Sequence, residues 1–199
     1  MRSAAARDGT EDDHCVFCDA MAADPGERAV EDQVLAEHGD LVLMPTVGPL
    51  VAGHALIVTA THTEGLWHSS PTLIRQYRAF VRDLRGRAAE RGDSLLEVEH
   101  GGRSLNGRMP CIAHTHVHVL PGLGHLVDVL ERSSLSRGIE PSYFWVSDGT
   151  DEFTYGATGA PSQLLRRAVA DALGLEHWDW ALMPPDGLLA ATVEYWADS

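Results

Sequence analysis

The sequence Ala113-His114-Thr115-His116-Val117-His118-Val119-Leu120-Pro121-Gly122 places three histidines at alternate positions. In a β-strand, successive side chains point to opposite faces, so the three histidines would share one face and the residues between them the other. Three imidazoles on one strand face are costly to satisfy unless a metal, a phosphate or mutual hydrogen bonds occupy them. The stretch therefore predicts a strand with one face for chemistry and one for packing.

The composition restricts the class of protein. The 199 residues fit one domain, or one domain with an appendage, and a hydrophobic share of 44% is enough for a core. A formal net charge of −14 argues against binding to a nucleic-acid backbone, although local donors can still hold a small anionic substrate. There is no apolar run of membrane-spanning length and no signal-peptide pattern. We therefore expect a cytoplasmic protein that binds neither nucleic acid nor membrane, with a disordered leader over residues 1–14.

The first part of the chain predicts an α+β unit. Short β-like runs precede a strong helix that Ser70 caps and Gly92 ends, with Pro71 in its first turn. Apolar residues recur along this helix at helical spacing and should pack on a sheet. A further strand, residues 95–99, leads through a polar loop into the histidine strand. Because short connections make neighbouring strands antiparallel, we expect an antiparallel sheet with packed helices.

The later part of the chain has a different character, but no repeat or low-complexity linker separates it. It predicts a hairpin around Ser147-Asp148-Gly149-Thr150. Helices are expected over residues 126–135, from Pro161 to Gly174, and over 188–196. We assign residues 15–125 to the main domain and 126–199 to a C-terminal α/β extension docked on it.

The cysteines indicate a reducing compartment, because three is an odd number and does not suit a disulfide framework. Cys15 and Cys18 form a CxxC pair, which zinc sites and redox motifs share. The βαβ setting of the redox motif does not precede it. Cys111, the third, has no neighbouring cation that clearly lowers its pKa and is interpreted as a packed thiol.

The segment His114–Leu120 resembles the signature of the histidine triad (HIT) family, His-φ-His-φ-His-φ-φ with φ apolar. The Cys-x-Phe-Cys start, the Gly53-His54 strand and the later His62 follow the family order. Residues 161–180 resemble the tail of a bacterial HIT-like subgroup, which also carries Glu-His-Gly before the triad, as residues 99–101 do. The resemblance spans roughly residues 15–125 and implies a HIT-like fold and, by analogy, a homodimer.

The resemblance implies nucleotide chemistry. HIT proteins hydrolyse or transfer nucleoside monophosphates at the α-phosphate, with the middle histidine as nucleophile. In this chain His116 would form a nucleotidyl-histidine intermediate, and His118 would hold the phosphate. Neutral imidazole is a competent nucleophile near pH 7. The residues expected to bind the substrate are His54, Asn106, Gly107, Pro110 and Cys111.

A structural metal is also implied by the resemblance. In HIT members that begin with CxxC, the two cysteines and two histidines bind zinc, and the matching residues here are Cys15, Cys18, His62 and His114. Such a Cys₂His₂ set suits tetrahedral Zn²⁺ and would attach the N-terminal segment to the sheet. No redox cofactor is expected. His114 would then be unavailable as a catalytic acid.

Several residues depart from the family pattern. Met109-Pro110-Cys111 replaces a Gly-Gln-Ser/Thr-type segment, and Pro45-Thr46-Val47 replaces an acidic residue near the ribose, so we expect a specialised substrate. Arg166 and Arg167 are interpreted as surface or interface residues. Two alternatives stay open. One is a non-catalytic nucleotide-binding protein of HIT fold, and the other is a cupin-like enzyme whose three strand histidines bind a redox metal.

Overall fold

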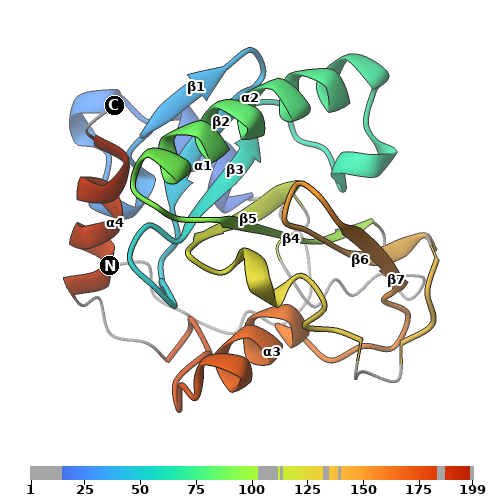
Figure 1. The fold of residues 1–199 in the computed structure, drawn as a ribbon. Helices are drawn as coiled ribbons and strands as arrows, with labels where there is room; N and C mark the ends of the chain where they lie inside the picture. Colours follow the sequence, from blue (N-terminus) through green and yellow to red (C-terminus); the bar gives the residue numbers. More distant parts are fainter. Residues whose placement is uncertain are drawn as a thin grey trace.

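The histidine strand lies in the interior of an antiparallel sheet in the computed structural model of the chain (Figure 1). The structure describes residues 15–102, 112, 114–131, 135–138, 140–182 and 187–197. Within them the sheet has seven strands in the order β1-β2-β3-β5-β4-β6-β7. The strands are β1 (Ala36–His38), β2 (Leu41–Pro45), β3 (Ala55–Thr59), β4 (Leu95–Gly102), β5 (His116–Pro121), β6 (Ser142–Ser147) and β7 (Glu152–Gly156). The helices are α1 (Val16–Ala22), α2 (Pro71–Glu90), α3 (Leu164–Leu173) and α4 (Gly187–Ala197), and the short 3-10 helices are η1 (Pro25–Glu27), η2 (Val30–Asp32), η3 (Leu66–His68) and η4 (Gly124–Leu126). The predicted α+β class is confirmed.

The pleat of β5 separates its histidines from its valines. β5 pairs with β3 on one side and with β4 on the other, so both of its edges are hydrogen-bonded. Val117 and Val119 belong to a buried cluster that includes Phe80 and Leu84 of α2. His116 and His118 therefore lie on the sheet face opposite α2. The strand begins only at His116, so His114 lies just before it.

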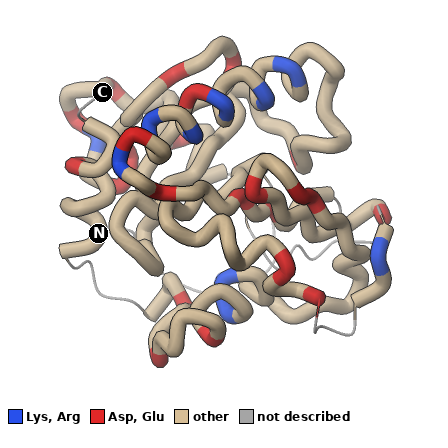
Figure 2. The backbone as a smooth tube through the Cα atoms, in the orientation of Figure 1, with Lys and Arg blue, Asp and Glu red and all other residues tan. Residues whose placement is uncertain are grey.

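Local sequence signals account for α2. The Ser70 hydroxyl accepts a hydrogen bond from the Leu73 amide at 3.2 Å, and Pro71 occupies the first turn. The apolar stripe packs on the sheet, as predicted. Figure 2 shows that basic residues lie along α2. Among them, Arg75 and Arg82 are exposed to solvent.

Two apolar clusters cover the histidine face of the sheet. The first lies under α1 and joins Phe17 to Val58 and other buried residues of β2 and β3. The second lies under α3 and joins Leu165 to Val98 and other buried residues of β4 and β6. α2 and α3 lie on opposite sides of the sheet (Figure 1). The histidines of β5 are thus placed between α1 and α3.

The chain after residue 125 contributes to the same sheet. β6 pairs with β4, and β7 pairs with β6 as the predicted hairpin. The helix predicted over residues 126–135 is wrong: among the described residues of that stretch, a 3-10 helix ends at Leu126 and turns follow to residue 131. Leu130 is nevertheless buried, which explains the misleading apolar pattern. No helix in the described part of the chain is long and apolar enough to cross a membrane.

Candidate active site and metal centre

Four predicted metal ligands meet beside the start of β5. Their ligand atoms all lie within 4.8 Å of one another. The Sγ atom of Cys15 is 3.1 Å from Nδ1 of His114, and Sγ of Cys18 is 3.5 Å from the same nitrogen and 3.6 Å from Nδ1 of His62. Tetrahedral zinc, with Zn–S near 2.3 Å and Zn–N near 2.0 Å, separates sulfur from nitrogen by about 3.6 Å. The donor set and its spacing therefore fit Zn²⁺.

The backbone orients His114 toward the two sulfurs. Its Nε2–H donates to the Thr59 carbonyl at 2.7 Å, which leaves the lone pair on Nδ1, the nitrogen nearest both cysteines. A backbone carbonyl on the second nitrogen is the usual support of a metal-binding histidine. His114 is buried, and burial lowers its pKa to about 4, so the imidazole is neutral at pH 7.

In His116 the proton and the lone pair lie on the opposite nitrogens from those in His114. Its Nδ1 lies 2.7 Å from the carbonyl oxygen of His114, and because that oxygen can only accept, Nδ1 carries the proton. Nε2 therefore keeps its lone pair. Burial lowers the pKa of His116, so its neutral form predominates at pH 7. The ring of Phe17, a residue of α1, packs against this imidazole, with 5.4 Å between the two ring centroids.

A chain of hydrogen bonds fixes the proton of His118. The Leu50 amide donates to Nδ1 of His54 at 3.0 Å, so the proton of neutral His54 is on Nε2. That Nε2 lies 2.9 Å from Nδ1 of His118, which must therefore accept. The proton of His118 is left on Nε2. Burial, and secondly the charge of Arg166, lowers the pKa of His54 well below its ordinary value, and burial is also the main cause for His118.

One further histidine lies on the same sheet face. The ring of His100, near the end of β4, packs on Phe144 at 4.4 Å, and its Nε2 is 3.4 Å from the Ser142 hydroxyl. Burial lowers its pKa to about 4.

Of the other expectations from the sequence, some concern residues that the structure does not describe and one is wrong in part. Asn106, Gly107, Pro110 and Cys111, predicted to bind the substrate, lie outside the described residues, so that role stays a prediction. Arg166 is expected to be a surface or interface residue; the surface role is wrong, because this residue is only 5% exposed within the chain. Its guanidinium donates to two backbone carbonyls, of Gly48 in the loop before β3 and of Trp178 after α3.

Some groups that hold the histidines were not identified from the sequence. The Leu50 amide and the Thr59 carbonyl are backbone atoms, which every residue type shares, so no sequence signal marks them. Phe17 stands inside the Cys-x-Phe-Cys start, and its contact with His116 becomes visible only when α1 is placed on the sheet.

The fold and the site define an α+β protein with a triad of histidines at the start of an interior strand and a Cys₂His₂ cluster beside the first of them. No family model matches the chain. In sequence, the chain is 25% identical over 115 residues to Protein hit of Bacillus subtilis. The matched region covers 56% of this chain and 73% of that protein.

Two solved structures among those found are similar over about half of the chain. One is a Zn-bound histidine triad family protein from Mycobacterium smegmatis, with 23% identity, a TM-score of 0.40, and coverage of 54% of this chain and 73% of that one. The other is a HIT family protein from Bacillus anthracis, with 17% identity, a TM-score of 0.41, and coverage of 55% and 73%. The chain is thus similar to histidine triad proteins, in line with the resemblance noted in its sequence.

Proposed function

We propose that this chain is a histidine triad hydrolase or nucleotidyl transferase that acts at the α-phosphate of a nucleotide conjugate. The observation that supports it most strongly is the hydrogen bond from Nδ1 of His116 to the His114 carbonyl, at 2.7 Å. It leaves the Nε2 lone pair on a neutral imidazole, which is the state a nucleophile needs.

Covalent catalysis by His116 would take two steps. First, the Nε2 lone pair forms a bond to the α-phosphorus, and the bond to the leaving group breaks, its electron pair departing with that group. Second, an oxygen of water or of another acceptor attacks phosphorus and loses its proton to solvent or to the departed leaving group, and the P–N bond breaks to restore the lone pair. The ring is positively charged between these steps, and the hydrogen bond from Nδ1 to the His114 carbonyl stabilises that charge.

His118 supports this reaction as a hydrogen-bond donor. Its Nε2–H points from the same strand face as His116, and the two rings lie 5.5 Å apart. A donor fixed in advance beside a phosphoryl oxygen stabilises charge that develops there. In this proposal His54 acts through His118, because its Nε2–H is already given to that ring at 2.9 Å.

The Cys₂His₂ cluster would hold Zn²⁺ in a structural role. Bound there, Zn²⁺ would crosslink α1, the loop after β3 and the start of β5. Within the described residues, the side chains gathered for a metal are Cys15, Cys18, His62 and His114, and His116 and His118 are not among them. This arrangement does not favour the cupin-like alternative, in which all three triad histidines would bind one ion.

The nucleophile is tested by trapping the intermediate. The protein is incubated with nucleoside phosphoramidates, dinucleoside polyphosphates and nucleotide sugars, and its intact mass is measured. We expect a nucleotidyl adduct that His116→Ala abolishes and that His125→Ala, a change at an exposed histidine of η4, leaves unchanged. Undiminished turnover by His116→Ala would exclude His116 as nucleophile. Mononucleotide binding without any product across the panel would indicate the non-catalytic alternative.

The metal is tested by elemental analysis of the purified protein. We expect about one zinc per chain, retained in His116→Ala, because His116 is not a ligand in the proposed site. Iron that is lost with this substitution would instead support the cupin-like alternative.

We also propose a homodimer, by analogy with HIT proteins. Light scattering coupled to size-exclusion chromatography should give twice the chain mass, and a monomer across the accessible concentrations would contradict it. The cytoplasmic location stays a prediction.

A further inference from the structure

Arg166 connects α3 to the loop that precedes β3. The side chain is only 5% exposed. Its Nη2 donates to the Gly48 carbonyl at 2.6 Å, and its Nε donates to the Trp178 carbonyl at 3.1 Å. The planar guanidinium can serve two acceptors in fixed directions at once, which an ammonium group cannot do. Arg166 therefore ties the loop after β2 to the segment that follows α3.

The loop held in this way carries the amide that orients His54. Leu50 is only two residues beyond Gly48, and its N–H donates to His54 Nδ1 at 3.0 Å in a buried hydrogen bond. Leu50, His54, His118 and Arg166 line the same small space between α3 and the sheet. A displacement of Gly48 would thus also displace the Leu50 amide, two residues further on, from His54.

α4 supports the far end of the same loop. The Gly53 amide donates to the Thr192 hydroxyl at 3.1 Å, and Nε1–H of Trp196 donates to the Gly53 carbonyl at 2.8 Å. The loop is thus hydrogen-bonded to α3 through Gly48 and to α4 through Gly53.

We propose that Arg166 is a positioning residue for His118: by holding the Gly48 carbonyl, it keeps the Leu50 amide on His54 and so determines which nitrogen of His118 carries the proton. The functional part of this inference rests on the proposed function, in which the Nε2–H of His118 donates to a phosphoryl oxygen. It gives the C-terminal part of the chain a role in the reaction, although no residue of that part needs to touch the substrate.

The geometry explains why the tautomers depend on the Leu50 amide. A proton on Nδ1 of His118 would face the Nε2–H of His54, so the proton of His54 would have to move to Nδ1. There it would face the Leu50 N–H, and two donors would oppose each other. Burial, and in addition the cation of Arg166, lowers the pKa of both imidazoles and keeps them neutral, so that only their tautomers are at issue. Without Arg166, the Gly48 carbonyl would lose this partner, and the Leu50 amide would lose the support that holds it on His54.

Long-range ¹H–¹⁵N spectra of the imidazoles test the tautomer directly in the full chain. In the wild-type protein we expect neutral His54 and His118, each with its proton on Nε2. In Arg166→Met we expect a mixture of tautomers for His118 and faster hydrogen exchange of the Leu50 amide. Arg167→Met is the matched control, because Arg167 is the next residue on α3 and its side chain is 59% exposed. It should leave both spectra and exchange unchanged.

Kinetics separate positioning from a general loss of structure. In Arg166→Met, the first-order rate of adduct formation should fall about 10- to 100-fold, taking the loss seen when a group that orients a metal-binding histidine is removed as the guide. The substrate concentration for half-maximal rate should change less than about threefold, because binding contacts are kept. Arg166→Lys should recover part of the rate, since it retains the charge but cannot bridge both carbonyls.

Each outcome decides for or against the role of Arg166. A wild-type His118 with its proton on Nδ1 overturns the proposal, and so does an Arg166→Met protein with wild-type spectra and rate. Should Arg166→Met not fold, the exchange of the Leu50 amide in Arg166→Lys decides: faster exchange supports the proposal, and wild-type exchange overturns it. Absence of an adduct in the wild-type protein would refute the proposed function, whereas the tautomers would still test this inference.

Discussion

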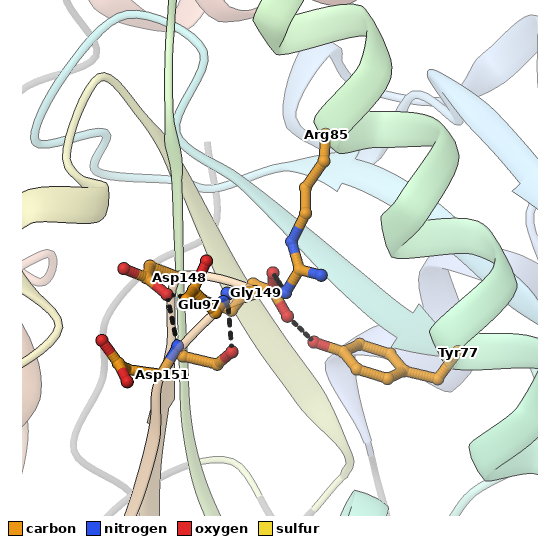
Figure 3. A network of polar contacts seen from close by, with 8 residues as sticks. Tyr77, Arg85, Glu97, Asp148, Gly149 and Asp151 are labelled. Carbon is orange, nitrogen blue, oxygen red and sulfur yellow. Dashed lines mark hydrogen bonds and ion pairs between the residues drawn. The ribbon is translucent and has the colours of Figure 1, made fainter.

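A buried carboxylate on β4 makes the stability of this protein depend on pH. Glu97 is fully buried and accepts hydrogen bonds from the Tyr77 hydroxyl, at 2.6 Å, and from the Arg85 guanidinium (Figure 3). Burial raises the pKa of Glu97 from 4.5 to about 6, although Arg85 and Tyr77 both lower it. We predict that Arg85→Met destabilises the fold, and that its cost grows as the pH rises.

The sign follows from proton binding. The pKa of Glu97 is higher in the folded state, so the folded protein holds this proton more tightly than the unfolded chain does. The resulting stabilisation is fully present below pH 4.5 and is lost as the pH rises through about 6, by about 2 kcal/mol in total. Without Arg85 the pKa of Glu97 rises further, so ionisation costs more.

The magnitude depends on which form of Glu97 loses its partner. At pH 5 the carboxyl is mostly protonated, and Arg85→Met removes an ordinary hydrogen bond worth about 1 kcal/mol. At pH 8 the substitution leaves a buried anion with Tyr77 as its remaining hydrogen-bond donor among the contacts described, and breaking such a pair costs about 3 kcal/mol. We take the lower end of the usual range because the Arg85 side chain is 30% exposed.

Urea unfolding followed by circular dichroism at pH 5, 6.5 and 8 measures this difference. Arg82→Met is the matched control, since Arg82 is an exposed residue of the same helix, and it should change stability by less than about 0.5 kcal/mol at every pH. In a protein that already carries Glu97→Gln, the cost of Arg85→Met should be the same at all three pH values. An equal cost of Arg85→Met at pH 5 and pH 8 would refute the reasoning.

Three further predictions concern other parts of the structure. Cys18→Ser should lower bound zinc well below one ion per chain and lower the thermal midpoint, and equal zinc in variant and wild type would argue against the cluster. Gly102→Ala should cost more than about 3 kcal/mol in urea unfolding, because φ is +86° and the new Cβ would lie 1.8 Å from the Pro141 carbonyl oxygen; a cost below about 1 kcal/mol would contradict this. Tyr143→Phe removes the hydroxyl that donates to Glu99 at 2.7 Å, and since burial raises the Glu99 pKa to about 7, the cost should grow from pH 5 to a total of about 2 kcal/mol at pH 8. A cost that is equal at both pH values would show that Glu99 does not titrate in this range.

The elements that the sequence predicts correctly carry their own local signals. The cap at Ser70 and the proline after it are complete within a few residues, and α2 begins where they predict. The alternation of β5 is also local, because the pleat alone assigns Val117 and His118 to opposite faces.

The elements that sequence reasoning missed depend on distant partners. Helical spacing places the consecutive residues Arg166 and Arg167 on different faces of α3. Spacing alone cannot tell which face meets solvent and which meets protein. One of the two carbonyls that accept from Arg166 belongs to Gly48, 118 positions earlier. The helix prediction over residues 126–135 fails for the same reason. The apolar residues around Leu130 pack into the cluster under α3 from a series of turns and do not form the stripe of a helix.

The positions of the triad histidines are set from both ends of the triad. At the first end, His114 contributes its imidazole to the Cys₂His₂ cluster and its carbonyl to Nδ1 of His116, so one residue joins the metal centre to the proposed nucleophile. At the other end, His118 receives its orientation from His54, and through it from the loop that α3 holds. A shift of His114 would change the acceptor of His116, whereas a shift of the loop would change the donor of His118. Changes at the two ends should therefore affect different groups of the proposed reaction, the nucleophile and the phosphoryl donor, and combining them tests whether the two histidines act independently.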